Sequence, residues 1–553
     1  MKRMTSVLLA AVMLLSFAAC GGAADAPVGG SPVVNVPVEE AYAHAVPIVL
    51  SDDMTDAPAG VTLSNDIVYY EAGHDFTYGE GSAADEHSPE EAAAHLVVTI
   101  TEPGEYLLTG KLTAGQIAVD LGSDAKKDPN AVVTLIFGGA DITCTVAPAV
   151  IFYNVYECGD KDNGTKDVDT SRAGANVIIA DGTVNNISGA YVARIYKSVV
   201  LSDDGTEVVD SKKLHKYDGA FYSKMSMNMD GGANGNGVLN ITAANEGLDS
   251  ELHLTINGGV INIESGNDGI NTNEDEVSVT TVNGGQLTIT VNGSTGEGDG
   301  IDSNGWLVIN GGTVIARGCG SSMDGGIDSD MGIHLNGGTV IATGNMMDAI
   351  AGTKGNYVVF QFAQTQKGGQ SVVLKNAAGA AVMDIAPAND YRYLVFSAPE
   401  LAAGDYTLWC GGKQVSGTSS SGMGMMGMGG GMRPNGGNMQ LPEGMELPDG
   451  FDFGQMQGSG RGPGFESMVP FDGQGMQLPE GMDGFDFSQM PNGGGMQRPE
   501  GMELPDGFDF SQMQGGGRGQ RPDGMSGVGI GNAGEVSDVF TITEGANSFM
   551  VNG

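Results

Sequence analysis

The sequence is poor in aromatic, cysteine and basic residues. Of its 553 residues, 6% are aromatic, 5 are cysteine and 25 are lysine or arginine, whereas 91 are glycine. So few aromatic rings among so many glycines argue against one conventional large core. The 68 acidic residues give a formal net charge of −43. Nucleic acid and anionic membrane surfaces are disfavoured as partners, because phosphate contacts need clusters of lysine and arginine. This acidity indicates either solubility alone or binding of divalent cations.

The four cysteines after residue 20 are too scattered for a zinc site. Cys144, Cys158, Cys319 and Cys410 form no CxxC pair and have no histidine-rich spacing around them. Cys144 and Cys158 lie 14 residues apart. They could pair as a disulfide or remain as buried thiols.

The N-terminal apolar run is too short to span a membrane, but it has the pattern of an export signal. Lys2 and Arg3 precede an apolar segment at residues 6–17, and small residues lead to Cys20. The pattern resembles a bacterial lipoprotein signal. That resemblance implies lipidation of Cys20 and a surface-exposed, extracytoplasmic protein of the cell envelope, held to the membrane by the lipid alone. An ordinary cleaved secretory peptide is the alternative.

Helical periodicity is absent from residues 225–350, and a fixed repeat takes its place. The tripeptide Asn-Gly-Gly begins at Asn257, Asn283, Asn310 and Asn336, at spacings of 26, 27 and 26 residues. Alternating β-branched residues follow the turns, and Asn with Gly tolerates the positive φ of a tight turn. A fixed period in this range is typical of stacked repeats, because one repeat cannot bury its apolar face alone.

A second motif lies between these turns, at the less regular spacings of 22, 31 and 26 residues. Its four copies are Glu246-Gly-Leu-Asp249, Asp268-Gly-Ile-Asn271, Asp299-Gly-Ile-Asp302 and Gly325-Gly-Ile-Asp328. Three short strands and three turns fit one repeat, so the pattern predicts an all-β fold, a parallel β-helix. The usual hand of parallel crossovers predicts that it is right-handed. A helical βαβ array lacks support because the helical period is missing.

Shifts in composition divide the chain into five regions. We expect a signal peptide at residues 1–20, a tether at 21–60, the parallel β-helix at 61–355, a small antiparallel β module at 356–415 with 531–553, and a Gly/Met/Pro-rich insertion at 416–530. The composition of the insertion cannot offset the entropy cost of ordering its backbone, so it is predicted to be disordered. Binding of a soft metal by its methionine thioethers is an alternative role.

The second motif places acidic residues one repeat apart. Adjacent strands of a sheet are about 4.8 Å apart, so carboxylates at equivalent positions repel one another unless they are protonated or bridged by a cation. Calcium suits such a row, because it accepts oxygen ligands in flexible geometry. The candidate calcium ligands are Glu246, Asp249, Asp268, Asn271, Asp299, Asp302, Asp324 and Asp328. The alternative is that these side chains cap turns through local backbone hydrogen bonds.

Several segments together resemble a known family. They are Gly219-Ala-Phe-Tyr-Ser-Lys224, Glu246-Gly-Leu-Asp-Ser-Glu251, Asp268-Gly-Ile-Asn271, the Asn-Gly-Gly turns, and the opening segments Glu105-Tyr-Leu-Leu-Thr-Gly-Lys-Leu112 and Gly115-Gln-Ile-Ala-Val-Asp120. They are similar to the bacterial carbohydrate-binding β-helix proteins first described as cellulose- and pectin-binding components in clostridia. The resemblance covers about residues 95–355. It implies a right-handed parallel β-helix resembling polysaccharide lyases, bound calcium, and affinity for acidic or cellulosic glycans.

Basic residues are scarce in the repeats, and this bears on the choice between binding and catalysis. Between Met225 and Thr353 the one lysine or arginine is Arg317, whereas a calcium-dependent lyase needs a base beside the metal. Arg317 is therefore a weak candidate for a catalytic base. His253 and His334 lie in alternating strands, which favours a structural role.

The sequence thus favours a calcium-dependent polysaccharide-binding protein over an enzyme. Tyr222 and Trp306 are candidates for stacking on sugar faces. A calcium-dependent polysaccharide lyase and a non-catalytic structural surface lipoprotein or adhesin are the alternatives.

Overall fold

The computed structural model describes residues 37–71, 81–202, 205, 208–420 and 536–552. The chain divides into two units, one of Met1–Gly430 with Gly531–Gly553 and the other of Gly431–Ile530. All described residues belong to the first unit. The signal peptide, its Cys20 and all but the first residues of the expected insertion lie outside the described residues.

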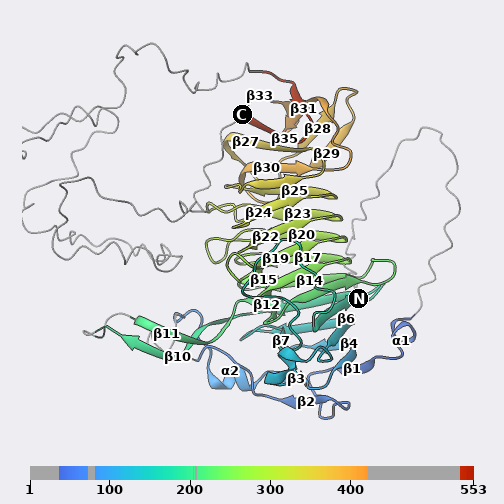
Figure 1. The fold of residues 1–553 in the computed structure, drawn as a ribbon, viewed down its shortest axis with the longest axis vertical. Coiled ribbons are helices and arrows are strands. Elements are labelled where there is room, and N and C mark those ends of the chain that lie inside the picture. The colour runs from blue at the N-terminus through green and yellow to red at the C-terminus, as the bar shows by residue number, and fades with distance from the viewer. Residues whose placement is uncertain (1–36, 72–80, 203–204, 206–207, 421–535, 553) are drawn as a thin grey trace, which may run out of the picture. The chain divides into compact units, whose positions relative to one another are not determined.

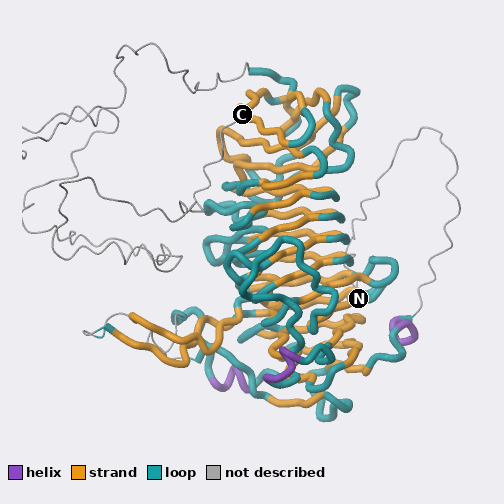
Figure 2. Tube along the Cα trace, viewed as in Figure 1, coloured by secondary structure: helices purple, strands orange, loops and turns teal. Residues whose placement is uncertain are grey.

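The described chain is nearly all β, which confirms the predicted class (Figure 2). Its helices are the short α1 (Val38–Ala41), α2 (Pro89–Ala93) and the 3₁₀ helix η1 (Ser123–Lys127). Ser88 caps α2, because its hydroxyl accepts from the backbone N–H of Glu91 and the Glu91 carboxylate accepts from the Ser88 N–H. Among the described residues, no helix has the length and apolar character needed to cross a membrane.

Strands in the body of the fold are stacked on one another (Figure 1), and their pairings arrange them in three columns, of which the second and third belong to the same sheet. The first column is β2 (Val61–Ser64), β3 (Leu96–Ile100), β5 (Gly115–Asp120), β7 (Val150–Asn154), β12 (Gly219–Ser223), β15 (Glu246–Ser250), β18 (Ile270–Thr272) and β21 (Ile301–Ser303). The second is β8 (Ala175–Ile179), β13 (Met227–Gly231), β16 (His253–Ile256), β19 (Val279–Val282), β22 (Trp306–Ile309), β24 (Gly332–Leu335) and β26 (Ile350–Thr353). The third is β9 (Val184–Gly189), β14 (Val238–Ala243), β17 (Val260–Ser265), β20 (Gln286–Val291), β23 (Thr313–Arg317) and β25 (Thr339–Gly344).

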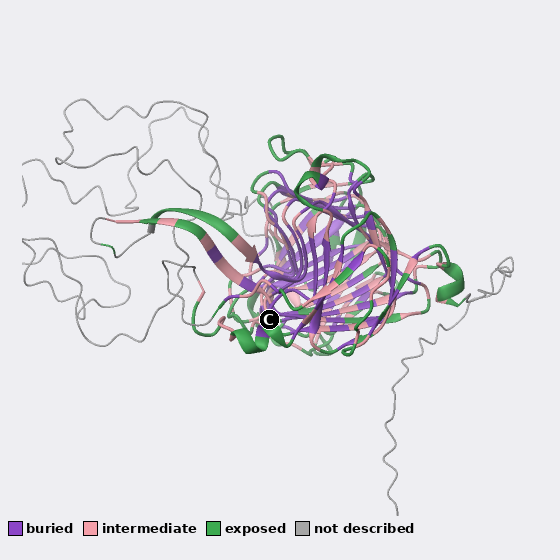
Figure 3. Ribbon diagram, turned by 90° about the horizontal axis from the view of Figure 1, so that it is seen from below, coloured by how far each residue is buried: buried purple, intermediate pink, exposed green. Residues whose placement is uncertain are grey.

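Strands one repeat apart pair in parallel. In the second column Ile256 lies opposite Val282, Val282 opposite Ile309, and Ile309 opposite Leu335. Each of these residues comes directly before an Asn-Gly-Gly turn, so the turns also stack. The same four residues are buried, and Figure 3 shows buried residues gathered inside the stack. The 26-residue period therefore predicted the pairing correctly.

The glycines of the turn and of the motif each recur for a steric reason. The second glycine of the first Asn-Gly-Gly, Gly259, has a φ of 91°, and Gly338 of the last has a φ of 76°, where a side chain would be strained. The motif glycine Gly269 instead faces the interior. A Cβ there would lie 2.1 Å from Cγ2 of Ile289 and 2.6 Å from the carbonyl oxygen of Gly300. The motif glycine is thus required by core packing.

Ordered structure begins earlier than the sequence suggested. Residues 21–60 were expected to be a tether, but β1 (Val46–Leu50) pairs in parallel with β4 (Gly104–Leu112), and β4 pairs with β6 (Val133–Cys144). Ile48 and Leu50 alternate into the core with 1% and 3% exposure. That burial stabilises the strand, so the tether expectation is wrong for the described residues from Val46 onward.

An antiparallel hairpin, β10 (Val192–Leu201) with β11 (Val208–Tyr217), interrupts the stack before β12. It projects to the left in Figure 1. The sequence analysis did not predict it, because its strands do not share the period of the repeats. Its return strand leads directly into the first column at Gly219.

The C-terminal strands are of mixed direction, whereas a purely antiparallel module was expected. They are β27 (Tyr357–Gln366), β28 (Val372–Asn376), β29 (Ala381–Ile385), β30 (Tyr391–Ser397), β31 (Gly404–Cys410), β32 (Lys413–Gln414), β33 (Ser416–Ser419), β34 (Phe540–Ile542) and β35 (Ala546–Asn552). Most pairs are antiparallel, but β27 and β35 are parallel. The rings of Phe360, Phe540 and Phe549 pack together in their core.

Candidate functional site

The first column carries the acidic residues of the second motif. Asp249 of β15 lies opposite Asn271 of β18, and Asn271 lies opposite Asp302 of β21. Backbone hydrogen bonds place Asp268 and Asp299 at equivalent positions one repeat apart, because the N–H of Gly247 donates to Asp268 and that of Gly269 donates to Asp299. Oxygen-bearing side chains therefore form an acidic row along this column.

Asp324 does not lie at the position in the row that the sequence suggested. The N–H of Gly300 donates to the carbonyl oxygen of Gly325, so Gly325 is the equivalent of Asp299 in the next repeat. The Asp324 carboxylate accepts from the backbone N–H of Gly298 at 2.7 Å and from the Ser322 hydroxyl. It therefore joins its own loop, through Ser322, to the loop of the preceding repeat, through Gly298.

The acidic row has a buried end at Asp218, Glu246 and Asp249. Each of these three residues offers a carboxylate oxygen, and the three oxygens lie within 4.8 Å of one another. Asp249 is 0% exposed and Glu246 is 4% exposed. The Asn271 amide donates to Oε1 of Glu246 at 3.1 Å, and the Asn273 amide donates to Oδ1 of Asp249 at 2.7 Å.

Three buried oxygens at this end have no hydrogen-bond partner among the described residues. They are Oε2 of Glu246, Oδ2 of Asp249 and Oδ1 of Asn271. A buried carboxylate oxygen without a partner is costly, and native proteins usually satisfy it. Carboxylate and amide oxygens gathered in this way are the ligands that calcium prefers. The donor set at the buried end therefore fits a divalent cation.

Burial and neighbouring negative charges raise the pKa values of the carboxyls at the buried end. Burial, followed by the charge of Asp218, raises the pKa of Glu246 to about 8. Burial, followed by the charge of Glu246, raises the pKa of Asp249 well above its ordinary value. Without a cation these carboxyls are held partly protonated at neutral pH, because two such charges cannot both remain ionised side by side.

The other end of the row, from Asp299 onward, is less buried. Asp299, Asp302 and Asp328 are all half-buried. Burial, followed by the charges of Asp302 and Asp348, raises the pKa of Asp328 to about 7. Burial, followed by the charge of Asp328, raises the pKa of Asp299 as well. We call Asp299, Asp302 and Asp328 the open end.

Lys216 and Asp218 were missed by the sequence analysis. Nζ of Lys216, at the end of β11, lies 2.5 Å from Oδ2 of Asp218. Burial alone would lower the pKa of the Lys216 ammonium, but the charges of Asp218 and Glu246 raise that pKa overall. The one available signal was Asp218-Gly219, an acidic residue before glycine as in the later motifs.

Arg317 lies in β23 of the third column, whereas the acidic row lies on the first. Its guanidinium donates to Oγ1 of Thr290 at 3.0 Å and to the carbonyl oxygen of Ile289 at 3.4 Å, both on the preceding repeat. His253 is buried, and its Nδ1 accepts from the N–H of Val279 at 3.1 Å. Burial lowers the pKa of His253 to about 4, which keeps the ring neutral. These contacts give Arg317 and His253 structural roles.

Of the two proposed stacking residues, Tyr222 is buried and Trp306 is partly covered. Tyr222 is 1% exposed, its ring packs on Tyr217 at 5.2 Å between centroids, and its hydroxyl donates to Glu251 and the carbonyl oxygen of Lys216. Trp306 is half-buried, and Gly164 of the loop at residues 155–174 lies close to its ring. Tyr222 therefore presents no open face for a sugar, and the ring of Trp306 is covered in part.

The described cysteines are all free thiols. Cys144 is buried and Cys158 is half-buried, so the disulfide that their spacing allowed is not formed. Burial raises the pKa of Cys144 and that of Cys158 to about 11 each, which keeps both thiols unreactive at neutral pH.

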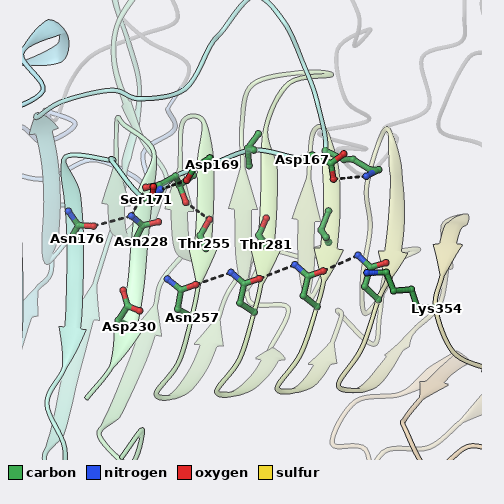
Figure 4. Close-up of a pocket in the computed structure, with 17 residues that line it drawn as sticks. Asp167, Asp169, Ser171, Asn176, Asn228, Asp230, Thr255, Asn257, Thr281 and Lys354 are labelled. Atoms are coloured by element: carbon green, nitrogen blue, oxygen red, sulfur yellow. Dashed lines mark hydrogen bonds and ion pairs between the residues drawn. The ribbon is translucent and has the colours of Figure 1, made fainter. Parts of the chain in front are cut away.

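A separate groove of about 770 Å³ lies on the second column (Figure 4). The strands that contribute Asn228, Thr255 and Thr281 form its floor. The loop at residues 155–174 crosses one side, where Oγ1 of Thr170 and Oγ1 of Thr255 are 2.7 Å apart. The stacked Asn-Gly-Gly turns form the opposite side. The groove and the acidic row lie on different columns of the stack.

The turn asparagines of this groove form a continuous chain of amides. Nδ2 of Asn283 donates to Oδ1 of Asn257 at 2.8 Å, and the same bond links Asn310 to Asn283 and Asn336 to Asn310 at 2.9 Å. We call these four residues the groove ladder. Figure 4 shows it along the lower side of the groove.

Comparison with known proteins places the chain in a family. The model of a family described as carbohydrate-binding domain-containing protein matches residues 95–384, more than half of the chain. The chain belongs to this carbohydrate-binding domain-containing family. The matched residues include both the acidic row and the groove. Both sites therefore lie within the carbohydrate-binding region.

Two further comparisons concern curated proteins and solved structures. No curated protein matches this carbohydrate-binding chain. A solved structure, described as that of the polysaccharide lyase-like protein from C. thermocellum in a gadolinium derivative, is 22% identical. The match covers 47% of this chain and 83% of that one, with a TM-score of 0.30.

Proposed function

We propose that this carbohydrate-binding protein is an exported, lipid-anchored, calcium-dependent polysaccharide-binding protein for acidic or cellulosic glycans. The observation that carries the calcium part of the proposal is the buried end of the acidic row, where Glu246 and Asp249 each keep a carboxylate oxygen without a partner among the described residues. The carbohydrate-binding family of residues 95–384 supports the glycan part. We further propose that the three columns form a right-handed parallel β-helix. Parallel pairing of strands one repeat apart in each column supports that interpretation.

The buried end would hold calcium through Asp218, Glu246, Asp249 and the Asn271 amide oxygen. A bound calcium ion supplies positive charge that offsets crowded carboxylates and can be shared with the carboxylate of a uronic acid. Glu246 and Asp249 are too buried to meet a polysaccharide themselves. Their role is to fix the first column beneath the hairpin, so a cation at this end is structural.

The open end is the part of the row that a glycan can approach. Asp299, Asp302 and Asp328 are half-buried, and Asp302 lies in register with Asn271, which in turn lies opposite Asp249 of the buried end. A chain with a net charge of −43 repels a polyuronate. Binding of an acidic glycan at these carboxylates therefore requires a cation between the two, which makes retention dependent on calcium.

Lyase activity is the alternative that one contact favours. Lys216 is a basic residue beside the carboxylates, and a lyase needs a base near its metal. The raised pKa of Lys216 opposes this role, because an ammonium that holds its proton cannot abstract one. Arg317 is engaged by Ile289 and Thr290. Binding without turnover is therefore favoured, and a structural surface lipoprotein or adhesin that binds no glycan is the remaining alternative.

Retention on immobilised polygalacturonate, with calcium or with EDTA, tests the proposal. We expect retention in calcium and its loss in EDTA. The Asp302→Asn variant should weaken retention about tenfold, the size of one lost charge-assisted contact. Glu264→Gln is the matched control, because Glu264 is an exposed carboxylate on the third column. Retention that is indifferent to EDTA would refute the calcium dependence.

The same sample tests the alternatives. Steady growth of absorbance from unsaturated sugars during long incubation would assign the protein to the lyases, and absence of retention on every glycan would favour the structural role. A Cys20→Ser variant tests the lipid anchor. It should move from the membrane fraction to the soluble extracytoplasmic fraction, and unchanged fractionation would refute lipidation at Cys20.

A further inference from the structure

We infer that the groove on the second column is a second glycan site, which binds an extended, uncharged polysaccharide chain without a cation. The inference rests on the proposed polysaccharide binding, but it concerns a different column from the acidic row. It confines the calcium dependence to acidic glycans at the acidic row and assigns uncharged chains to the groove. It begins from the size of the groove. A volume of about 770 Å³ is within the range of small-molecule sites and accommodates several sugar units.

The lining of the groove suits hydroxyl groups. Amides and hydroxyls predominate, including those of Asn228, Thr281 and the groove ladder. A carboxamide has two N–H donors and two acceptor lone pairs. Within the ladder, Asn283 and Asn310 each use one N–H and one lone pair on their ladder neighbours. Each of these amides therefore keeps one N–H donor and one acceptor lone pair for a ligand. A sugar hydroxyl can both accept from the first and donate to the second.

The spacing of these amides is that of a polymer template. Successive ladder residues belong to successive repeats, so they are about 4.8 Å apart. One hexose of a straight, extended chain has a comparable length. The four ladder residues therefore present the same pair of hydrogen-bonding groups to about three successive sugars. A straight β-linked chain can meet this regular series, whereas a chain that coils cannot.

Charge favours a neutral chain over a polyuronate. The lining contains two lysines and three aspartates. Lys166 is paired with Asp167 at 2.6 Å between Nζ and Oδ1, so the local charge is nearly balanced. The groove thus lacks both the concentrated negative charge of the acidic row and the cluster of positive charge that would attract uronates directly. No cation is needed to bring an uncharged chain into it.

The structure supplies a matched control for the test. A second amide chain, Asn186, Asn240 and Asn262, runs along the third column with the same geometry, its bonds being 2.9 Å long. Asn240 has an amide neighbour on each side in that chain, as Asn283 has in the groove ladder. Replacing either by alanine removes two ladder bonds, but only Asn283 lines the groove.

The experiment is calorimetric titration of the full chain and its variants with cellohexaose, mannohexaose and maltohexaose, each in calcium and in EDTA. We expect cellohexaose and mannohexaose, which are straight and β-linked, each to bind with the same affinity in calcium as in EDTA. Maltohexaose, which coils, should bind with lower affinity. Asn283→Ala should weaken binding about fivefold to tenfold, as expected for one or two lost hydrogen bonds. Asn240→Ala should leave the affinity unchanged. It should lower the melting temperature by about as much as Asn283→Ala does, because each variant loses two ladder bonds. Thr281→Arg, which fills the groove without breaking the ladder, should abolish binding.

Three outcomes would overturn the inference. They are failure of any neutral oligosaccharide to bind, equal affinities for Asn283→Ala and Asn240→Ala, and undiminished binding by Thr281→Arg. The proposed function is tested separately, because Asp302→Asn should affect polygalacturonate in calcium and leave cellohexaose unaffected. If Asp302→Asn does not weaken polygalacturonate binding, the cation-dependent site is refuted while the groove site stands. If no neutral oligosaccharide binds, the groove site is refuted while the cation-dependent site stands.

Discussion

Lys216 and Asp218 form an ion pair, with 2.5 Å between Nζ and Oδ2, at the point where the hairpin β10–β11 returns to the first column. The same ammonium influences the buried Glu246 and Asp249. One lysine therefore partly neutralises three crowded carboxylates. Hairpin and acidic row are coupled through this contact, and a cation at the buried end would share these carboxylates with the lysine.

Replacing Lys216 by glutamine should show that Lys216 stabilises the carboxylates in the absence of calcium and competes with calcium when it is present. The variant leaves the carboxylates without their counter-charge, so the protein in EDTA should lose roughly 1–3 kcal/mol of unfolding free energy. Calcium affinity should rise several-fold, because a competing positive charge has gone. Denaturant unfolding and calcium titration measure the two effects. Lys213→Gln is the control, since Lys213 of the same strand pairs with Glu251 at 3.3 Å instead. Identical behaviour of the two variants would contradict the coupling.

The stability of the cation-free protein should fall as pH rises. The folded-state pKa of Glu246, raised to about 8, means that the folded chain keeps a proton that the unfolded chain releases near pH 4.5. This contribution is complete below about pH 4.5, and it is lost progressively as pH rises through about 8. Melting temperatures in EDTA should therefore decrease from pH 5 to pH 8.

Calcium should reverse that trend, since cation binding requires ionised carboxylates and strengthens as protons leave. The increase in melting temperature caused by calcium should be larger at pH 8 than at pH 5. Calorimetric scans at both pH values, with and without calcium, measure it. A pH profile that is the same in calcium and in EDTA would show that the buried carboxyls hold no cation.

The inward glycine of the motif should be intolerant of any side chain. In Gly269→Ala the new Cβ would lie 2.1 Å from Cγ2 of Ile289, and overpacking of this kind costs about 1–3 kcal/mol. Gly355→Ala is the matched control, because no atom lies within 4 Å of a Cβ at that position. Urea unfolding of the two variants gives the comparison. Equal midpoints would mean that the stack can expand locally around residue 269.

The parallel pairing and the order of the acidic row were predictable because they depend on a period that the sequence displays. Asp249, Asn271 and Asp302 fall in register since each follows a glycine and an apolar residue that must face the core. Asp324 lies one position before the equivalent of Asp299, because the last motif begins with Gly325, and its charge still helps to raise the pKa of Asp299.

Features outside the period could not be predicted. Lys216 reaches the carboxylates only because the hairpin β10–β11 folds back, and no spacing in the sequence encodes that return. The groove depends on the loop at residues 155–174, which pairs Thr170 with Thr255 over 85 residues of sequence. Tyr222 was expected to be accessible, but the end of β11 covers it. Contacts made by non-repeating segments decide which repeated residues remain exposed.

The Asp249→Asn variant should have opposite effects in the two metal states. Asparagine has nearly the same size and carries no charge, so in EDTA at pH 8 it should stabilise the fold by roughly 1–3 kcal/mol through removal of a crowded buried carboxylate. In calcium the same change removes a charged ligand, so the stabilisation caused by calcium should largely disappear. Thermal unfolding in both buffers measures the difference, with Glu264→Gln as the control. A purely structural Asp249 would instead give destabilisation of equal size in both, because its hydrogen bond from Asn273 does not depend on a cation.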